Sequence, residues 1–438
     1  MSDFDIGLAM FAAALVLIAL RMPVGVAMLL VGGVGFATIG GWDRLFATLN
    51  SMTFSRFSSY TLSVIPLFLL MGDFATKGGM NRALFRCARA WMGHWRGGLA
   101  VATIGGCAAF GAICGSSLAT AATMSQVAGP EMRRNGYSPA LATGTLAAGG
   151  TLGILIPPSV ILVIYAIYTE MSIGTLFVAA VIPGLIATAG YMLVVNIYAR
   201  LNPNAAPPAE RLDLREKLRA TAEVWPVAMV FILVVTGIYG GWFSATEGAA
   251  IGAAATFLLA VTLGGMRWEG LRESLLSTTV TTGLIFVVLL GAELFSAALA
   301  LSRLPAELSA VVATFDVAPI VILLMILLIY FILGCFMESL AMVLLTLPIF
   351  IPLMLSLDFG LGREQVLVWF GILVLMSVEV GMISPPFGLN LFVINAMAKD
   401  VPMGETYRGV MGFVASDFVR IILLALLPAI TLWLPGLW

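Results

Sequence analysis

Charged side chains are scarce in this sequence. Only 10% of its 438 residues are Asp, Glu, Lys or Arg, 61% are hydrophobic, and the mean hydropathy is +1.06. Soluble domains carry about 25% charged residues. A membrane-spanning helix needs about 20 apolar residues, and such runs recur from one end of the chain to the other. The scarcity of charge therefore excludes a soluble domain and predicts an all-α polytopic membrane protein. The net charge of −1 gives no sign of a nucleic-acid partner.

Residues that commonly build catalytic and metal sites are also few. The single histidine, His94, lies in a basic connector, and the four cysteines form no CxxC pair. The cysteines are interpreted as small buried apolar residues rather than as disulfides or metal ligands. An HExxH motif, a GxxxxGK[ST] nucleotide loop and a catalytic dyad at membrane depth are all missing. We therefore expect no enzyme and no cofactor, and energy for any transport must come from an ion gradient or another chain.

Two hydrophobic segments are interrupted where a continuous helix would not be. The segment 98–128 is broken by Gly115-Ser116-Ser117, and the segment 139–168 is broken by Gly149-Gly150, Gly153 and Pro157-Pro158. Irregular backbone survives at membrane depth only where it is buried in protein or lines a cavity. Basic residues flank 98–128 at both ends, which predicts a re-entrant helical hairpin with a serine-rich tip. Broken segments of this kind form the binding sites of many secondary transporters.

The second half of the chain repeats this pattern. A long apolar segment, 318–357, is interrupted near 334–339, and the span 366–397 is broken at 381–390. Gly111-x4-Ser116 corresponds to Gly334-x4-Ser339, and Gly153-Ile-Leu-Ile-Pro157-Pro158 corresponds to Gly381-Met-Ile-Ser-Pro385-Pro386. An odd number of crossings separates the halves, so we expect inverted repeats with two re-entrant hairpins and two broken helices. The site is then expected near the midplane, where the repeats meet.

The positions of Lys and Arg set the predicted topology. Five basic residues in the connector 76–97 alternate with apolar ones, which predicts an amphipathic helix at the membrane surface. The polar loop 200–223 is expected in the cytoplasm, both termini are expected outside, and residues 42–59 are interpreted as a polar loop. The other spans are expected at about 6–20, 24–41, 60–75, 174–199, 224–241, 247–264, 275–301 and 404–435.

Each half supplies oxygen atoms suited to a small cation, namely backbone carbonyls freed at a break and Ser, Thr, Asn or carboxylate side chains. The candidate cation ligands and the residues that shape their site are Gly115, Ser116, Ser117, Thr120, Gly150, Thr151, Gly153 and Pro157 in the first half, and Glu338, Ser339, Ser384, Pro385, Gly388 and Asn390 in the second. An alternative is that the small residues only allow close helix packing. Paired prolines at matching places favour the site, because each removes a backbone donor.

An anionic substrate would be attracted by the positive ends of the half-helices at the breaks. The candidate substrate-binding residues are Ser116, Ser117, Pro158, Ser159, Pro386 and Asn390. The acids Glu338 and Glu379 lie beside the breaks, and a role in the site and a structural role both stay open for them. Asp417 and Arg420 are three residues apart on one expected helix, which favours a structural ion pair.

Several long motifs resemble the large membrane subunit of TRAP (tripartite ATP-independent periplasmic) transporters, the DctM-like family. In the first half these are Gly115-Ser116-Ser117-Leu-Ala119-Thr120, Met132-Arg133-Arg134-Asn-Gly136-Tyr137 and Gly153-Ile-Leu-Ile-Pro157-Pro158-Ser159. In the second they are Thr246-Glu247-Gly248-Ala249 and Ser384-Pro385-Pro386-Phe387-Gly388-Leu389-Asn390. The resemblance covers essentially the whole chain. It departs from the family at Glu338, where Asp is frequent, and at Gly248, where Ala is usual.

This resemblance implies import of an organic acid, such as a C4-dicarboxylate or a sialic acid, coupled to sodium ions across a bacterial inner membrane. It implies two partners: a periplasmic substrate-binding protein and a small four-helix membrane subunit (DctQ-like). It also implies an elevator mechanism. The corresponding parts are scaffold helices 1–75 and 224–301, arms 76–97 and 302–317, and transport regions 98–199 and 318–438. The alternative is a stand-alone sodium–dicarboxylate symporter of similar architecture.

Overall fold

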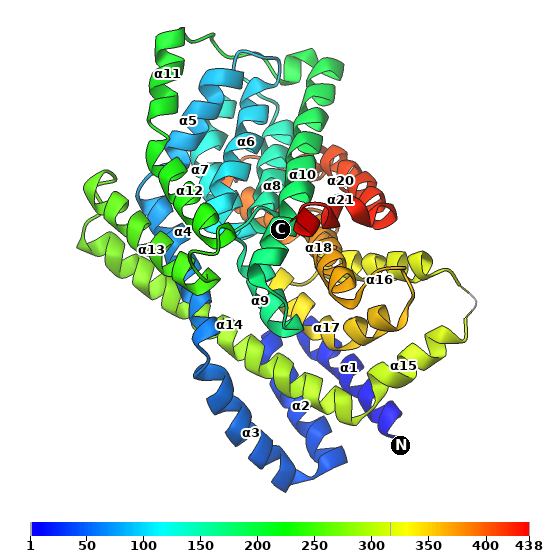
Figure 1. Ribbon diagram of the computed structural model, residues 1–438. Helices are drawn as coiled ribbons and strands as arrows, with labels where there is room; N and C mark the ends of the chain where they lie inside the picture. The colour runs from blue at the N-terminus through cyan, green and yellow to red at the C-terminus, as the bar shows by residue number, and fades with distance from the viewer. Residues whose placement is uncertain (1, 316, 438) are drawn as a thin grey trace. The chain divides into compact units, whose positions relative to one another are not determined.

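The computed structural model describes residues 2–315 and 317–437, and within them the chain is built of helices and connecting turns with no strand (Figure 1). Seven helices there are long and apolar enough to cross a membrane, or up to nine if each of two bent helix pairs counts as one span. The expected all-α polytopic architecture is therefore confirmed.

The chain divides into two compact units. The first comprises residues 1–63, 277–326 and 339–367. It contains α1 (Asp3–Ala19), α2 (Val24–Gly40), α3 (Trp42–Phe57), α15 (Leu304–Ala313), α17 (Ser339–Ser356) and most of α14 (Trp268–Leu301). Glycines let α2 approach α14 closely, since a Cβ added to Gly25 or Gly32 would lie within 3 Å of the α14 backbone. Arg56 at the end of α3 pairs with Glu293 of α14 at 2.6 Å.

The second unit comprises residues 64–276, 327–338 and 368–438 and contains most of the candidate site residues. At its core lies α8 (Pro139–Leu155), which packs against α6 (Gly98–Cys114), α7 (Ser117–Arg134) and α20 (Met403–Leu426). Almost every residue of α8 is buried. The remaining α-helices with residues in this unit are α4 (Val64–Lys77), α5 (Met80–Met92), α9 (Val160–Thr169), α10 (Ile173–Leu201), α11 (Leu214–Ala222), α12 (Trp225–Tyr239), α13 (Ala245–Thr262), α16 (Pro319–Gly334), α18 (Arg363–Met382), α19 (Leu389–Met397) and α21 (Pro428–Leu432).

The order of elements repeats along the chain. Helices α6, α7, α8, α9 and α10 of the first half are followed in the same order by α16, α17, α18, α19 and α20 of the second. Their neighbours also correspond, because α2 packs against α14 while α13 packs against α4. One difference between the halves lies along the chain: α3 ends at Phe57 and α4 begins at Val64, whereas α14 is a continuous helix of 34 residues. These equivalent contacts support the internal repeat expected from the sequence.

The interpretation of residues 42–59 as a polar loop was wrong, because most of them form α3. Leu45, Leu49 and Met52 recur at helical spacing, and Leu45 and Met52 are buried. Mean hydropathy hides this pattern, since polar residues such as Asp43 and Arg56 alternate with the apolar ones along α3. Within the predicted loop 200–223, α11 begins at a capping box formed by Asp213 and Glu216.

Two predicted spans also have different ends. The span expected at 275–301 begins seven residues earlier, at Trp268, and Glu273 in this added part pairs with Lys77. The span expected to reach residue 435 ends at Leu426, because Pro428 follows and the residue before a proline is disfavoured in a helix.

Several connectors of the second unit meet at one end of the bundle. The Gly97 N–H donates to the Ala206 carbonyl at 3.1 Å, and the Ser138 N–H donates to the Ala205 carbonyl at 2.9 Å. Partial burial lowers the pKa of His94, with smaller contributions from the nearby charges of Lys217 and Arg211. The sequence predicts that all these segments lie in the cytoplasm, and the structure places them together. The direction in which this end faces stays a prediction.

Candidate substrate and cation site

The first half of the site is the turn between α6 and α7. Gly115 takes the left-handed conformation, with a φ of +63°, and the extended Ser116 caps α7 by accepting a hydrogen bond from the Ala119 N–H at 3.4 Å. At the opposite ends of the two helices, the Leu99 N–H donates to the Tyr137 hydroxyl at 3.0 Å. The two helices therefore form a hairpin with Ser116 and Ser117 at its tip. Its re-entrant path in a membrane stays a prediction.

This tip lies against the break in the α8–α9 helix. The break covers residues 156–159 and contains the cis Pro157-Pro158 peptide, and Ser159 caps α9. A Cβ on Gly115 would lie 2.9 Å from the Pro158 carbonyl oxygen and 3.4 Å from the Val160 nitrogen. The N-termini of α7 and α9 are therefore adjacent, which the sequence alone could not establish. Two neighbouring helix N-termini favour a negatively charged ligand.

A residue from the second half completes this group. Asn390 of α19 is fully buried, and its side-chain amide donates to the Ser117 hydroxyl at 2.7 Å and to the Ala147 carbonyl at 3.3 Å. A Cβ on Gly150 would lie 3.2 Å from that amide nitrogen. The structure thus brings Ser117, Gly150 and Asn390 together, although 240 residues of sequence separate the last two.

Two buried oxygen atoms at this place have no hydrogen-bond partner among the described residues. They are Thr120 Oγ1 and Asn390 Oδ1. Thr120 Oγ1 and the Ser116 carbonyl oxygen both pack closely against Gly153, and the carbonyl oxygen would lie 2.7 Å from an added Cβ. Hydroxyl, carbonyl and amide oxygens are the ligands that hard cations prefer. The residues present therefore fit a small cation such as sodium.

The second half repeats the contact between hairpin and break. A Cβ on Gly381 would lie 2.6 Å from the Gly334 Cα, just as a Cβ on Gly111 would lie 2.6 Å from the Gly153 Cα. The Gly388 N–H, at the start of α19, donates to the Cys335 carbonyl at 3.3 Å. The glycine pairs matched in the sequence therefore make the same contact in each half.

Other predicted residues of the second half make local contacts. The Ser384 hydroxyl donates to the Val380 carbonyl at 2.6 Å, within its own chain segment. The Pro386 carbonyl accepts a hydrogen bond from the Tyr407 hydroxyl at 2.5 Å, and the Pro385 carbonyl accepts from Cys335 Sγ at 3.8 Å. Glu338 and Ser339 lie where the chain passes from the second unit to the first. Their part in a site stays a prediction.

Thr151 belongs to a different polar group. Its hydroxyl lies 2.7 Å from the Ala148 carbonyl and 3.1 Å from the Tyr191 hydroxyl, which in turn lies 2.7 Å from Asp417 Oδ2. Arg420 pairs with Asp417 Oδ1 at 2.8 Å, so the expected ion pair is present. Sequence reasoning missed Tyr191, whose only signal is a hydroxyl in an otherwise apolar run.

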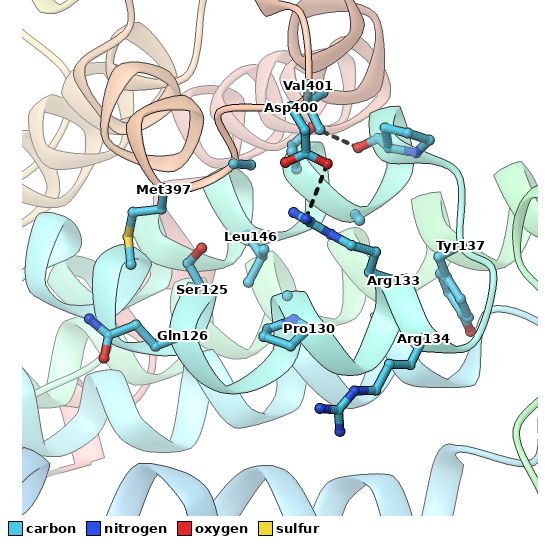
Figure 2. A pocket seen from close by; sticks show the side chains of 15 residues that line it. Ser125, Gln126, Pro130, Arg133, Arg134, Tyr137, Leu146, Met397, Asp400 and Val401 are labelled. Carbon is cyan, nitrogen blue, oxygen red and sulfur yellow. Dashed lines mark hydrogen bonds and ion pairs between the residues drawn. The ribbon is translucent and has the colours of Figure 1, made fainter.

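A pocket of about 410 Å³ lies between α7, α8 and the end of α19 (Figure 2). Its walls include Ser125, Leu146 and Met397, and Arg133 reaches across to Asp400 with a 3.1 Å ion pair. Ser125 lies eight residues after Ser117 on α7, which is about 12 Å along the helix. The pocket is thus near the end where the connectors meet, on the same three helices that carry the Ser117–Asn390 contact. No sequence pattern predicted it.

These features define a class of protein: a multi-pass helical membrane protein whose two repeated halves each place a hairpin turn against a broken helix. Secondary transporters commonly have this organisation.

Comparison with known proteins identifies the family. Residues 11–430 match the family model described as the DctM component of tripartite ATP-independent periplasmic transporters. The chain is 36% identical to the C4-dicarboxylate TRAP transporter large permease protein DctM of Pseudomonas aeruginosa, over 87% of this chain and 88% of that protein. It is 30% identical to the sialic acid TRAP transporter large permease protein SiaM of Vibrio cholerae, over 95% of each.

The fold is also similar to a solved structure, that of the YdaH transporter of Alcanivorax borkumensis. The TM-score is 0.60, the sequence identity is 16%, and 88% of each chain is covered. The family model and the relatives named above show that the chain belongs to the DctM family of TRAP transporter large permeases, which are transporter subunits and not enzymes. The resemblance seen in the sequence is confirmed.

Proposed function

We propose that this chain is the permease subunit of a sodium-coupled importer of an organic acid, and that it receives its substrate from a binding protein. The observation that carries the proposal is the hairpin tip seated on the break, which joins two helix N-termini to a set of buried oxygen atoms. The two relatives described above are named for a C4-dicarboxylate and for sialic acid, and both of these ligands are carboxylic acids. A carboxylate is therefore the chemical group that we expect the site to bind.

The substrate carboxylate would be held at the N-termini of α7 and α9. Ser116 and Ser159 cap these helices, and the first N–H groups of a helix have no partner within the helix itself. Among the described residues of the second unit, Arg420 is the buried basic side chain. It is already paired with Asp417. Backbone dipoles and hydroxyl groups, rather than a basic side chain, are thus the available partners for an anion.

The cation would be held by the Ser116 carbonyl, Thr120 Oγ1 and Asn390 Oδ1. Its positive charge, when bound, would compensate the negative charge of the substrate. Asn390 links the α7 tip to α19, so occupation of this place would couple the two halves of the site. Glu338, Ser384 and Gly388 would provide the corresponding second set.

The same proposal includes the partners and the location. We place the chain in a bacterial inner membrane with both termini in the periplasm, together with a small four-helix subunit and a periplasmic binding protein. Regions 98–199 and 318–438 would move as the transport part of an elevator. A stand-alone sodium–dicarboxylate symporter is the second candidate, and uptake at full rate by this chain without partners would favour it.

The test is uptake into proteoliposomes that contain the chain, its small subunit and its binding protein, with a panel of C4-dicarboxylates and sialic acids and varied sodium. We expect uptake of at least one acid to require sodium. Ser116→Ala removes the side-chain cap that holds the α7 N-terminus and the Ser116 carbonyl in place, and Asn390→Ala removes the Oδ1 ligand. Each should raise the sodium concentration for half-maximal uptake about tenfold, which corresponds to about 1.4 kcal/mol.

Ser356→Ala is the matched control, because Ser356 only donates to the Leu353 carbonyl of its own helix. Sodium-independent uptake would refute the proposed coupling. An unchanged sodium requirement in both site variants would instead show that the cation is bound elsewhere.

A further inference from the structure

A second polar group in the same unit carries an inference of its own. Among the described residues, Glu379 and Asp417 are the fully buried acids, with an exposed fraction of 0%, and Arg420 is only 4% exposed. Asp417 pairs with Arg420 at 2.8 Å, and the guanidinium lies 5.4 Å from the centre of the Tyr191 ring. We call these four residues, together with Thr151, the buried charge cluster.

Two contacts connect the helix of Glu379 to the helix of Asp417 through α16. A Cβ on Gly334 would lie 3.0 Å from the carbonyl oxygen of Val378, the residue before Glu379. Phe331 lies one turn before Gly334 on α16. Its ring packs edge-on against that of Phe418, the residue after Asp417, with ring centres 5.0 Å apart. Glu379 accordingly interacts electrostatically with both Arg420 and Asp417. Of the other helices that contact α20, α10 carries the exposed Arg200 at its end, and α8, α19 and α21 carry no charged side chain.

The formal charges of the cluster do not balance. Two ionised carboxylates against one guanidinium leave a net charge of −1 in a region away from water. Neither carboxylate oxygen of Glu379 has a hydrogen-bond partner among the described residues. Burial of an uncompensated, unpartnered charge is strongly unfavourable. One additional positive charge would make the cluster neutral.

The hydrogen bonds require one more proton as well. Thr151 to Ala148, Thr151 to Tyr191 and Tyr191 to Asp417 are three contacts of 2.7, 3.1 and 2.7 Å. The two hydroxyl groups supply only two protons, and a carbonyl or a carboxylate supplies none. If Asp417 carries a proton, it donates to Tyr191, Tyr191 donates to Thr151, and Thr151 donates to Ala148. All three contacts are then hydrogen bonds.

We propose that the buried charge cluster is a proton-binding site that holds one proton, shared between Asp417 and Glu379. The two acids act as a coupled pair, so the proton belongs to the pair rather than to one residue. Arg420 balances whichever carboxylate is ionised. The proton completes the hydrogen-bonded chain that passes through Thr151, one helical turn before the break in α8, and ends on the Ala148 carbonyl. This site is separate from the carboxylate and cation site, and its test does not depend on transport.

The test compares infrared spectra of the purified full-length wild type and of its variants at neutral pH. We expect one carboxylic-acid C=O band from a buried group in the wild type. Glu379→Gln and Asp417→Asn should each abolish it, because either variant leaves one carboxylate that Arg420 neutralises without a proton. Glu307→Gln, which changes an exposed acid, should keep the band. Melting temperatures of the variants verify that they are folded.

Three results would overturn the proposal. The first is the absence of a carboxylic-acid band in the wild type. The second is a band that persists in either the Glu379 or the Asp417 variant. The third is a band that appears only when sodium is removed, which would show that a metal cation provides the missing charge.

Discussion

At the scale of single residues, Gly153 shows how the lack of a side chain lets two oxygen atoms lie against the backbone. A Cβ there would meet Thr120 Oγ1 and would lie 2.7 Å from the Ser116 carbonyl oxygen. Both oxygens are ones that we propose as cation ligands, and Thr120 Oγ1 is buried without a protein partner in the described chain. The absence of a side chain at Gly153 is therefore part of the site.

We expect Gly153→Ala to lower sodium affinity at least tenfold, because the added methyl group would displace the two oxygen atoms. Overpacking of this kind typically costs about 1–3 kcal/mol. Sodium-dependent uptake in proteoliposomes measures the change. Gly283→Ala is the control, since no atom lies within 4 Å of its added Cβ. Equal sodium affinities in the two variants would contradict the proposed position of the site.

At the scale of helices, glycine contacts determine which elements can approach closely. The α8–α20 contact depends on Gly144 and Gly409. A Cβ on Gly409 would lie 2.5 Å from the carbonyl carbon of Ala140 and closer still to its oxygen. The same two helices carry Thr151 and Asp417, so this backbone approach also sets the geometry of the buried charge cluster.

Gly409→Ala should destabilise the chain by about 1–3 kcal/mol, because the backbone of α8 cannot move away as a flexible side chain could. Gly404→Ala, on the same helix but with open space around its added Cβ, should leave stability nearly unchanged. Melting temperatures of the two purified variants in detergent provide the comparison. If Gly409→Ala melts no lower than Gly404→Ala, the close contact does not stabilise the fold.

At the scale of the whole chain, the sequence predicts sides of the membrane and the structure groups the connectors. The Arg133–Asp400 pair and the hydrogen bonds from Gly97 and Ser138 to the 200–223 connector join segments that the positive charges assign to the cytoplasm. Ser172, at the start of α10, is an exposed position that the same topology assigns to the periplasm.

A cysteine at position 133 should react with a membrane-impermeant reagent only from the cytoplasm, and Ser172→Cys should react only from the periplasm. Both tests belong in a Cys87→Ser background, because the other three native cysteines are buried. Loss of the exposed Arg133–Asp400 pair should cost little stability. Labelling of position 133 from the periplasm would invert the predicted topology.

The repeat and its breaks could be predicted because they depend on local chemistry. Gly115, Pro157-Pro158 and Pro385-Pro386 interrupt helices whatever surrounds them, and the glycines matched between the halves make the same contacts. The helix α3 was missed for the opposite reason. Polar residues along this helix lower its mean hydropathy, and only the spacing of Leu45, Leu49 and Met52 indicates a helix.

The sequence by itself determined the membrane class of this protein, its family and the residues at which its helices break, since these follow from apolar runs and backbone-restricting residues. Only the tertiary structure decided which of these residues meet. It brought Asn390 to Ser117, placed the N-termini of α7 and α9 side by side, and directed Thr151 toward Tyr191 and Asp417. Such contacts join segments far apart along the chain, so they depend on how whole helices pack and not on any local pattern.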